Sequence, residues 1–359
     1  MSRIYNFNAG PAVLPLEVLQ TAQAELIDFQ NTGMSILESS HRAKAYEAIH
    51  EEAIASLREL LGISDDYAVL LLQGGASTQF SMVPMNLLLP GETADYTNSG
   101  AWASKAIKEA QKVGAVNVAA NCGKDIPTRV PSPAELKLTP GAKYLHVTSN
   151  ETISGAQWKT FPEVACPLVA DMSSDILSRP FDMSKFGLVY AGAQKNLGPS
   201  GLTVVIVRKD LAAQAPENLP TMMRYATHIE ENSLYNTPPC FSIYILALVL
   251  RWVKKQGRDA LYRQNAEKAA RLYAAIDGSE GWYRGTAVKE FRSDMNVTFR
   301  LPSEALEAAF VSQATKAGFN GLKGHRSVGG IRASIYNAFP PQGVADLVAF
   351  MADFKKANG

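Results

Sequence analysis

Apolar residues recur at helical spacing near the start of the chain. They predict amphipathic helices over residues 15–30 and 44–61, because one face of each segment is apolar and the other is polar. A proline opens the first segment, and Gly62 suits the left-handed position that ends the second. The first two elements that we expect are therefore helices.

From Tyr67 the pattern changes to short apolar runs that alternate with turns and helical segments. We expect strands at residues 68–72, 115–119, 144–148 and 202–207, two further strands that end near Asp171 and Lys195, and helices at residues 79–88 and 102–113. Such an alternation is typical of an α/β protein with a mostly parallel sheet.

After Phe241 the pattern becomes mixed α+β. We expect helices through Trp252 and over residues 258–276, a strand at 295–301, a capped helix that begins at 302–304, a strand at 331–336 and a helix at 342–356. This change predicts a large domain over residues 16–257 and a smaller domain made of residues 1–15 and 258–359.

Two residues at predicted strand ends carry the most informative chemistry. Asp171 and Lys195 each follow an apolar run, so we expect both at one edge of a parallel sheet, where open α/β folds bind ligands. A lysine there can form a Schiff base with pyridoxal phosphate, and an ionised aspartate can keep the pyridine nitrogen protonated. Strand-end Asp and Lys are also ordinary solubilising residues, but the Gly- and Pro-rich turn after Lys195 holds its amine on a tight corner.

The composition limits the classes of partner. With 35 basic and 34 acidic residues the formal net charge is +1, so no global field favours nucleic acid or an anionic membrane. The apolar runs fall far short of the roughly 20 residues that span a bilayer, and the N-terminus lacks a secretory pattern. Three widely spaced cysteines favour a reducing compartment. We expect a cytoplasmic protein with local anion sites, and we assign no metal site.

Further segments offer contacts to a phosphate and a ring. The turn at residues 73–78 lies between a strand and a helix, so its small residues and the hydroxyl of Ser77 or Thr78 can bind an anion at the helix N-terminus. Trp102 can stack on a flat ring, and Thr152 can reach a ring hydroxyl from a polar turn. Taken alone, these segments are at least as consistent with a plain helix start, a core tryptophan and a self-stabilised turn, and most tryptophans are core residues.

In their order along the chain, these segments resemble those of the phosphoserine aminotransferases, a family of class V aminotransferases in the fold-type-I pyridoxal-phosphate superfamily. The resemblance runs essentially end to end, from residues 6–11 to residues 324–334. It implies an α/β large domain, in which helices flank a mostly parallel seven-stranded sheet, and a smaller α+β C-terminal domain. It also implies a homodimer with active sites at the subunit interface.

The resemblance assigns residues to the cofactor pyridoxal 5'-phosphate. Lys195 would bind it covalently, Asp171 would face the pyridine nitrogen, and Trp102 would stack on the ring. Thr152 would lie near the ring hydroxyl. The cofactor phosphate would be held by Ala76, Ser77 and Gln194 and, from the second subunit, by Asn236 and Thr237.

The substrate is assigned to cationic residues, because guanidinium groups bind carboxylate and phosphate bidentately. Arg332 would bind the α-carboxylate. The phosphate, or the side-chain carboxylate of glutamate, would be bound by His41, Arg42, His325 and Arg326. Some relatives carry an arginine in place of Ser77, so one positive charge near this pocket is absent here.

The implied reaction is the reversible transfer of an amino group between L-glutamate and 3-phosphohydroxypyruvate, which forms 2-oxoglutarate and O-phospho-L-serine in serine biosynthesis. A role for 4-phosphohydroxythreonine in pyridoxine biosynthesis stays open. Lys195 would move the proton at the substrate Cα, and Asp171 would need a low pKa, sustained by the adjacent pyridinium charge, to stay ionised. The alternatives are another class V aminotransferase, a cysteine desulfurase, for which no cysteine lies in an obvious flexible loop, and a protein that only binds a phosphorylated metabolite.

Overall fold

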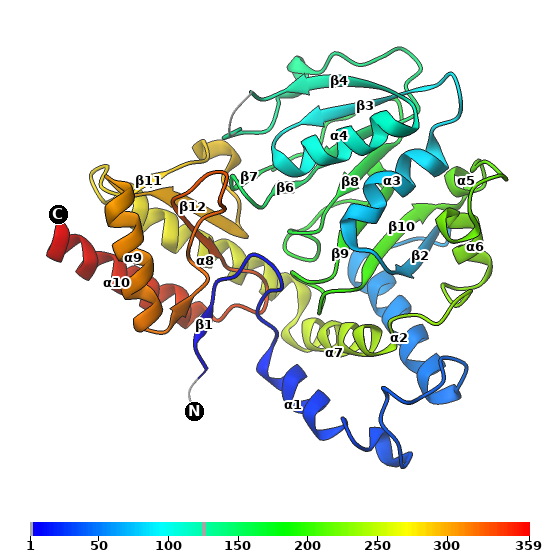
Figure 1. The fold of residues 1–359 in the computed structure, drawn as a ribbon, viewed down its shortest axis with the longest axis horizontal. Coiled ribbons are helices and arrows are strands. Elements are labelled where there is room, and N and C mark those ends of the chain that lie inside the picture. Colours follow the sequence, from blue (N-terminus) through cyan, green and yellow to red (C-terminus); the bar gives the residue numbers. More distant parts are fainter. Residues whose placement is uncertain (1–2, 124–126) are drawn as a thin grey trace.

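The computed structural model, which describes residues 3–123 and 127–359, is built around a sheet of seven strands (Figure 1). Their order across the sheet is β2 (Tyr67–Leu72), β10 (Thr203–Arg208), β9 (Phe186–Gly192), β8 (Leu168–Asp171), β5 (Leu145–Thr148), β3 (Thr93–Asn98) and β4 (Ala115–Asn121). β10 is antiparallel to both of its neighbours, and the other pairs are parallel. The predicted seven-stranded, mostly parallel sheet is confirmed.

The antiparallel strand follows from the short connection between β9 and β10. The backbone N–H of Ala193 donates to Leu202 O at 2.9 Å, which closes the loop that contains Lys195. Such a short loop can join only antiparallel neighbours, because parallel strands need a long crossover. The reversal of the chain at this point therefore places Lys195 at the end of β9.

Helices cover both faces of the sheet (Figure 1). Alternate residues of β2 face opposite sides, so Val69 and Leu71 pack with α2 (Lys44–Leu61) and α7 (Cys240–Gln256), and Leu70 packs with α3 (Gly75–Leu87) and α4 (Ala101–Val113). Two short helices, α5 (Lys209–Ala212) and α6 (Tyr225–Glu230), add to the second layer. Burial on both faces explains why the inner strands are nearly continuous apolar runs.

A separate apolar core joins the first residues of the chain to its C-terminal part. Phe7 and Val13 pack with α8 (Arg258–Asp277), α9 (Glu304–Lys316) and α10 (Pro341–Asn358). The strands of this part are β11 (Arg284–Gly285), β12 (Asn296–Arg300) and β14 (Ile331–Ser334) in one small sheet, and β1 (Tyr5–Asn6) paired with β13 (Phe319–Asn320). β14 carries Arg332, whose side chain reaches Thr152.

Some predicted elements differ from the structure. The first helix, α1, spans only Leu16–Ala24, and a short 3-10 turn with Gln30 in the left-handed region follows it. α3 begins at Gly75 rather than at residue 79, so part of the predicted turn is the first turn of the helix. β3 was not predicted, because its sequence is largely polar. Its Asp95 is buried and accepts hydrogen bonds from Asn117 and from the backbone of Thr139.

Within residues 3–123 and 127–359, no helix combines the length and the apolar character that crossing a bilayer requires.

Candidate active site

Asp171 and Lys195 meet at one edge of the central sheet, as the sequence predicted. Asp171 ends β8 and pairs in register with Tyr190 of β9, and Lys195 lies just beyond β9. A cavity of about 120 Å³ opens between them. It is lined by seven of the residues assigned to the cofactor: Ala76, Ser77, Trp102, Thr152, Asp171, Gln194 and Lys195.

The Lys195 amine is held from several sides. Its Nζ donates to Thr152 Oγ1 at 2.8 Å and lies 5.8 Å from the centroid of the Trp102 ring. Gly10 brings the N-terminal segment against the Lys195 stem, since a Cβ there would lie 3.6 Å from Lys195 Cγ. Burial lowers the pKa of Lys195 to about 8, against the raising effect of the Asp171 and Glu151 carboxylates. A share of the amine is therefore neutral near neutral pH.

Asp171 is oriented by a residue that the sequence did not identify. Ser173 donates to Asp171 Oδ1 from both its backbone N–H, at 2.9 Å, and its hydroxyl, at 2.6 Å. The same hydroxyl accepts from Gly192 N at 3.0 Å, which ties β9 to Asp171. Burial nonetheless raises the pKa of Asp171, while Ser173 and the positive charge of Lys195 lower it. The prediction of a low Asp171 pKa depends on the positive charge of a bound pyridinium ring, and it stays a prediction.

The N-terminus of α3 forms the anion end of the cavity. The residue before the helix, Gly74, is left-handed and provides no side-chain cap, so the first N–H groups of α3 are free of a capping side chain. Ser77 lines the cavity, whereas the Thr78 hydroxyl donates to Gly74 O at 3.0 Å within the helix. Of the two predicted hydroxyl donors, only Ser77 belongs to the cavity.

Basic residues lie next to this cavity. Arg332 Nη1 donates to Thr152 O at 3.4 Å. His325 precedes β14, and its pKa is lowered by burial and by the positive charges of Arg332, Arg326 and Lys105. A larger cavity of about 470 Å³ lies between the start of α4 and the loop at residues 327–328. His325, Arg326 and Arg332 are therefore brought together in one subunit.

Lys105 is a cation that the sequence did not identify. It lies on α4, and its Nζ stands 4.2 Å from the centroid of the Trp102 ring. In the sequence it looks like any solvated lysine of an amphipathic helix. Only the packing of α4 beside the His325 loop reveals its position.

Four other assigned residues lie away from these cavities. His41 and Arg42 lie on the segment before α2, and neither lines the cavities beside Lys195. Asn236 and Thr237 lie between α6 and α7, where Thr237 O accepts from Gln73 Nε2 at 3.4 Å. None of these four residues lines the cavities beside Lys195.

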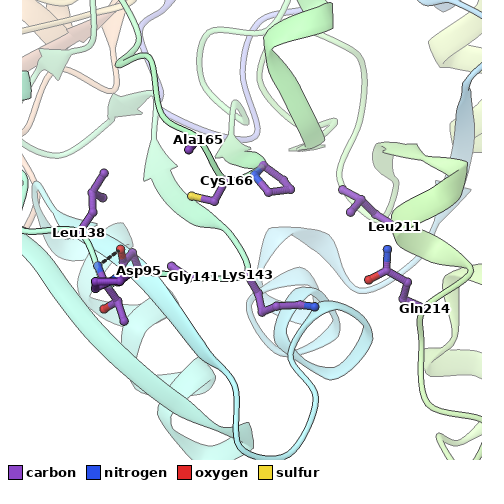
Figure 2. A pocket seen from close by; sticks show the side chains of 12 residues that line it. Asp95, Leu138, Gly141, Lys143, Ala165, Cys166, Leu211 and Gln214 are labelled. Atoms are coloured by element: carbon purple, nitrogen blue, oxygen red, sulfur yellow. Dashed lines mark hydrogen bonds between the residues drawn. The ribbon is translucent and has the colours of Figure 1, made fainter.

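A cavity of about 570 Å³ lies at the opposite end of the strands, where β3, β5 and β8 begin (Figure 2). Its charged groups already have partners: Lys143 pairs with Glu92 at 2.9 Å, and the Asp95 carboxylate accepts two hydrogen bonds. Burial raises the pKa of the Cys166 thiol there, which disfavours the reactive thiolate. Neither catalysis nor a desulfurase nucleophile is indicated at this cavity.

The cavity at Lys195 fits pyridoxal phosphate in its donor set. The Trp102 indole lies beside the place where the cofactor ring would lie. The Asp171 carboxylate lies at one end of the cavity, and the N-terminus of α3 lies at the other end. Buried polar atoms without partners among the described residues include Thr148 Oγ1, Trp102 Nε1 and Arg332 Nε. Such atoms at one site point to a polar ligand. The described residues form no cluster of three or more His, Cys, Asp or Glu side chains with metal-binding geometry.

Comparisons with known proteins identify the family of the chain. The family described as Aminotransferase class-V matches residues 4–347. The phosphoserine aminotransferase of Niallia circulans is 58% identical over 359 residues, with 99% of each chain covered. Two solved structures are similar: phosphoserine aminotransferase from Bacillus circulans subsp. alkalophilus (TM-score 0.97, 58% identity, 99% of each chain) and a pyridoxal-phosphate-bound phosphoserine aminotransferase from Trichomonas vaginalis (TM-score 0.93, 40% identity, 98% of this chain and 100% of that chain). The chain therefore belongs to the class V aminotransferases and, within them, to the phosphoserine aminotransferase family.

Proposed function

We propose that this chain catalyses the pyridoxal-phosphate-dependent, reversible transfer of an amino group between L-glutamate and 3-phosphohydroxypyruvate, as in serine biosynthesis. The observation that carries the proposal is the shared cavity of Lys195 and Asp171, with Arg332 against Thr152 of its lining. His325 and Arg326 lie in the loop before β14, which carries Arg332. The similarity to phosphoserine aminotransferases over the whole chain supports the substrate. Amination of 4-phosphohydroxythreonine's keto acid is a second reaction that the same cations would serve.

The cofactor would be held by the cavity residues. Lys195 would bind it covalently, Asp171 would accept from its pyridine N–H, and the start of α3 would bind its phosphate. When bound, pyridoxal phosphate supplies the carbonyl carbon that takes up the amino group and a ring that withdraws electrons from the substrate Cα.

The catalytic work of the chain centres on one proton. Lys195, with its pKa near 8, can take the proton from the substrate Cα and return it elsewhere. Thr152, at 2.8 Å from Nζ, limits where the amine can point. Ser173 favours the ionised form of Asp171, and a protonated ring beside the carboxylate would offset the effect of burial and keep Asp171 charged.

The cations would orient the substrate. Arg332 lies against Thr152 and so can hold the α-carboxylate near the Lys195 amine. The charges of Arg326 and Lys105 act on His325, which supports these three side chains as the group that would bind a distal phosphate or carboxylate. Lys105 would supply a charge that Ser77 does not. When the two anionic groups at the ends of the substrate are both bound, the position of the carbon between them is fixed.

We further propose a homodimer in which Asn236, Thr237, His41 and Arg42 reach the partner's cavity. All four lie away from the cavities of their own subunit. Exposed apolar side chains gather on α1 and the segment after it, which project from the body of the molecule (Figure 1): Leu16, Leu26, Ile27, Met34 and Leu37. A surface of this kind supports association with a second copy.

Two further predictions remain proposals. We propose that residues 16–257 form a large domain and that residues 1–15 and 258–359 form a small one, and the separate core of Phe7 with α8–α10 supports this division. We also infer a cytoplasmic location. Cys122, Cys166 and Cys240 are free thiols, which supports a reducing compartment.

A comparison of keto acids tests the proposed reaction. The pyridoxamine-loaded protein should aminate 3-phosphohydroxypyruvate at least a hundredfold more efficiently, as kcat/KM, than unphosphorylated hydroxypyruvate, about 2.7 kcal/mol of discrimination. Arg326→Ala should remove most of this ratio. Equal efficiency with both keto acids would indicate another class V aminotransferase, and a protein that binds the phosphorylated acid without turnover would indicate a binding protein.

A further inference from the structure

Glu151 is a buried carboxylate next to the active-site cavity, and none of the steps above uses it. It lies in β6 (Asn150–Glu151), a short strand that pairs with β7 (Ala156–Gln157), and its relative exposure is 0%. Thr152, the next residue, contacts the Lys195 amine. Burial of a charge without donors is strongly unfavourable, so the partners of this carboxylate indicate what it does.

The partners of Glu151 are at the first turn of α4. Its Oε2 accepts from the backbone N–H of Trp102 at 3.3 Å, and its Oε1 accepts from Ala103 N at 3.2 Å and from Ser99 Oγ at 3.4 Å. The residue before α4, Gly100, offers no side-chain cap. A residue 49 positions away therefore caps the helix whose second residue is Trp102.

Gly100 shows how closely the carboxylate approaches the helix. A Cβ at this position would lie 2.5 Å from Glu151 Cδ. The φ of Gly100 is 163°, an extended conformation that any residue adopts. The space needed by the Glu151 carboxylate, rather than the backbone conformation, therefore requires glycine here.

We propose that Glu151 is a positioning residue for the cofactor, whose carboxylate holds the Trp102 indole at the cavity while the adjoining Thr152 holds the Lys195 amine. This inference rests on the proposed function, because a stacked ring gives the position of Trp102 its purpose. Two contacts of the cofactor, the indole and the amine, are then set relative to one another by two adjacent residues of β6. A cap that only stabilised α4 would not require the indole and the amine to be positioned by adjacent residues.

The proposal also predicts a dependence on pH. Burial raises the pKa of Glu151 to about 7, against the lowering effect of the Ala103 and Trp102 N–H groups, and the Asp171 carboxylate raises it further. The titratable groups that face it are Asp171 at the end of β8, Lys195 after β9 and Cys122 after β4. Protonation replaces a charged acceptor with a neutral carboxyl, so the hold on α4 should weaken as the pH falls through about 7.

The test uses Glu151→Gln, which keeps the size of the side chain. The amide oxygen of the glutamine can accept from the N–H of either Trp102 or Ala103. Its NH2 group is itself a donor and cannot accept from the other N–H. In cofactor-free protein, acrylamide quenching of Trp102, obtained by subtracting the signal of Trp102→Phe, should rise at least twofold at pH 8. In the unmodified protein the same quenching should rise as the pH falls through about 7, whereas in Glu151→Gln it should be high throughout.

Cofactor binding gives the second reading. If the competent position of Trp102 falls to about a tenth of the population, the Kd for pyridoxal phosphate should rise about tenfold. Gly100→Ala should act in the same direction, because its Cβ displaces the carboxylate. Glu109→Gln on the same helix, whose carboxylate contacts Lys112 and Ser81, is the matched control and should change neither reading.

The outcomes separate the two proposals. Unchanged Trp102 quenching or an unchanged Kd in Glu151→Gln overturns the role of Glu151. This holds even if the variant has a lower free energy of unfolding, because a purely structural cap would have that effect. Failure of the unmodified protein to bind pyridoxal phosphate would instead overturn the proposed function. The quenching, measured without cofactor, would still decide whether Glu151 holds Trp102.

Discussion

Removing the Ser173 hydroxyl should raise the pH at which the enzyme loses activity on the acid side. In Ser173→Ala, Asp171 Oδ1 keeps the backbone donor at 2.9 Å but loses the hydroxyl donor at 2.6 Å. A hydrogen bond to a charged group contributes about 1.5 kcal/mol or more, and one pKa unit corresponds to about 1.36 kcal/mol. The pKa of Asp171 should therefore rise by about one unit.

The sign follows from the protonation states. The lost hydrogen bond stabilised the charged carboxylate, so a higher pH is needed to ionise Asp171 in the variant. The acid limb of the kcat/KM profile should move up by about one pH unit, and kcat on its plateau should change less.

The chain contains a matched control for this experiment. Ser184 donates to Asp182 Oδ1 from its N–H at 3.0 Å and its hydroxyl at 2.7 Å, in the same geometry but at the surface. Ser184→Ala should leave the profile unchanged. An acid limb that stays in place in Ser173→Ala would refute the role of Asp171 in protonating the ring.

Three further predictions follow from other contacts. Lys105→Ala should raise KM for the phosphorylated keto acid about fivefold, or about 1 kcal/mol, with little change in KM for the unphosphorylated acid. Lys108→Ala on the same helix is the control. Equal effects of the two substitutions on KM would show that Lys105 does not belong to the pocket. Mixing inactive Lys195→Ala with Arg42→Ala, which should bind the phosphorylated acid weakly, should raise kcat/KM for that acid above the value of Arg42→Ala alone after exchange of subunits, because a hybrid dimer has one intact site; no rise despite proven hybrids would contradict a shared site. Lys268→Met should lower the free energy of unfolding by about 2–4 kcal/mol in urea, since Lys268 Nζ donates to the carbonyls of Ile335, Tyr336 and Phe339 at 2.7–3.1 Å, and a change below about 1 kcal/mol would show that these bonds contribute little.

The fold was predictable where burial leaves a clear pattern. Strands buried on both faces are apolar runs, so β2, β9 and β10 could be located from the sequence alone. β3 could not, because its buried Asp95 is tolerated only through partners more than twenty positions away in the chain. The start of α3 was misplaced because Gly74 and Gly75 are typical of a turn, and here they begin a helix.

The site was predictable to the extent that its chemistry lies at strand ends. Asp171 and Lys195 could be paired because parallel strands end at one edge. Ser173, Lys105 and Glu151 could not be identified, since each acts through a contact that depends on tertiary packing. His41 and Arg42 do not line the cavities beside Lys195, and their role in the site stays a prediction that rests on the proposed dimer.

Covalent capture at Lys195 tests the central claim most directly. The protein reconstituted with pyridoxal phosphate should absorb at roughly 410 nm, as expected for a lysine-bound pyridoxal group. Borohydride should abolish this band and leave a pyridoxyl group on one peptide, at Lys195, with Lys105 and Lys268 unlabelled. A label at another lysine, or stable labelling at an equal level in Lys195→Ala, would contradict the account.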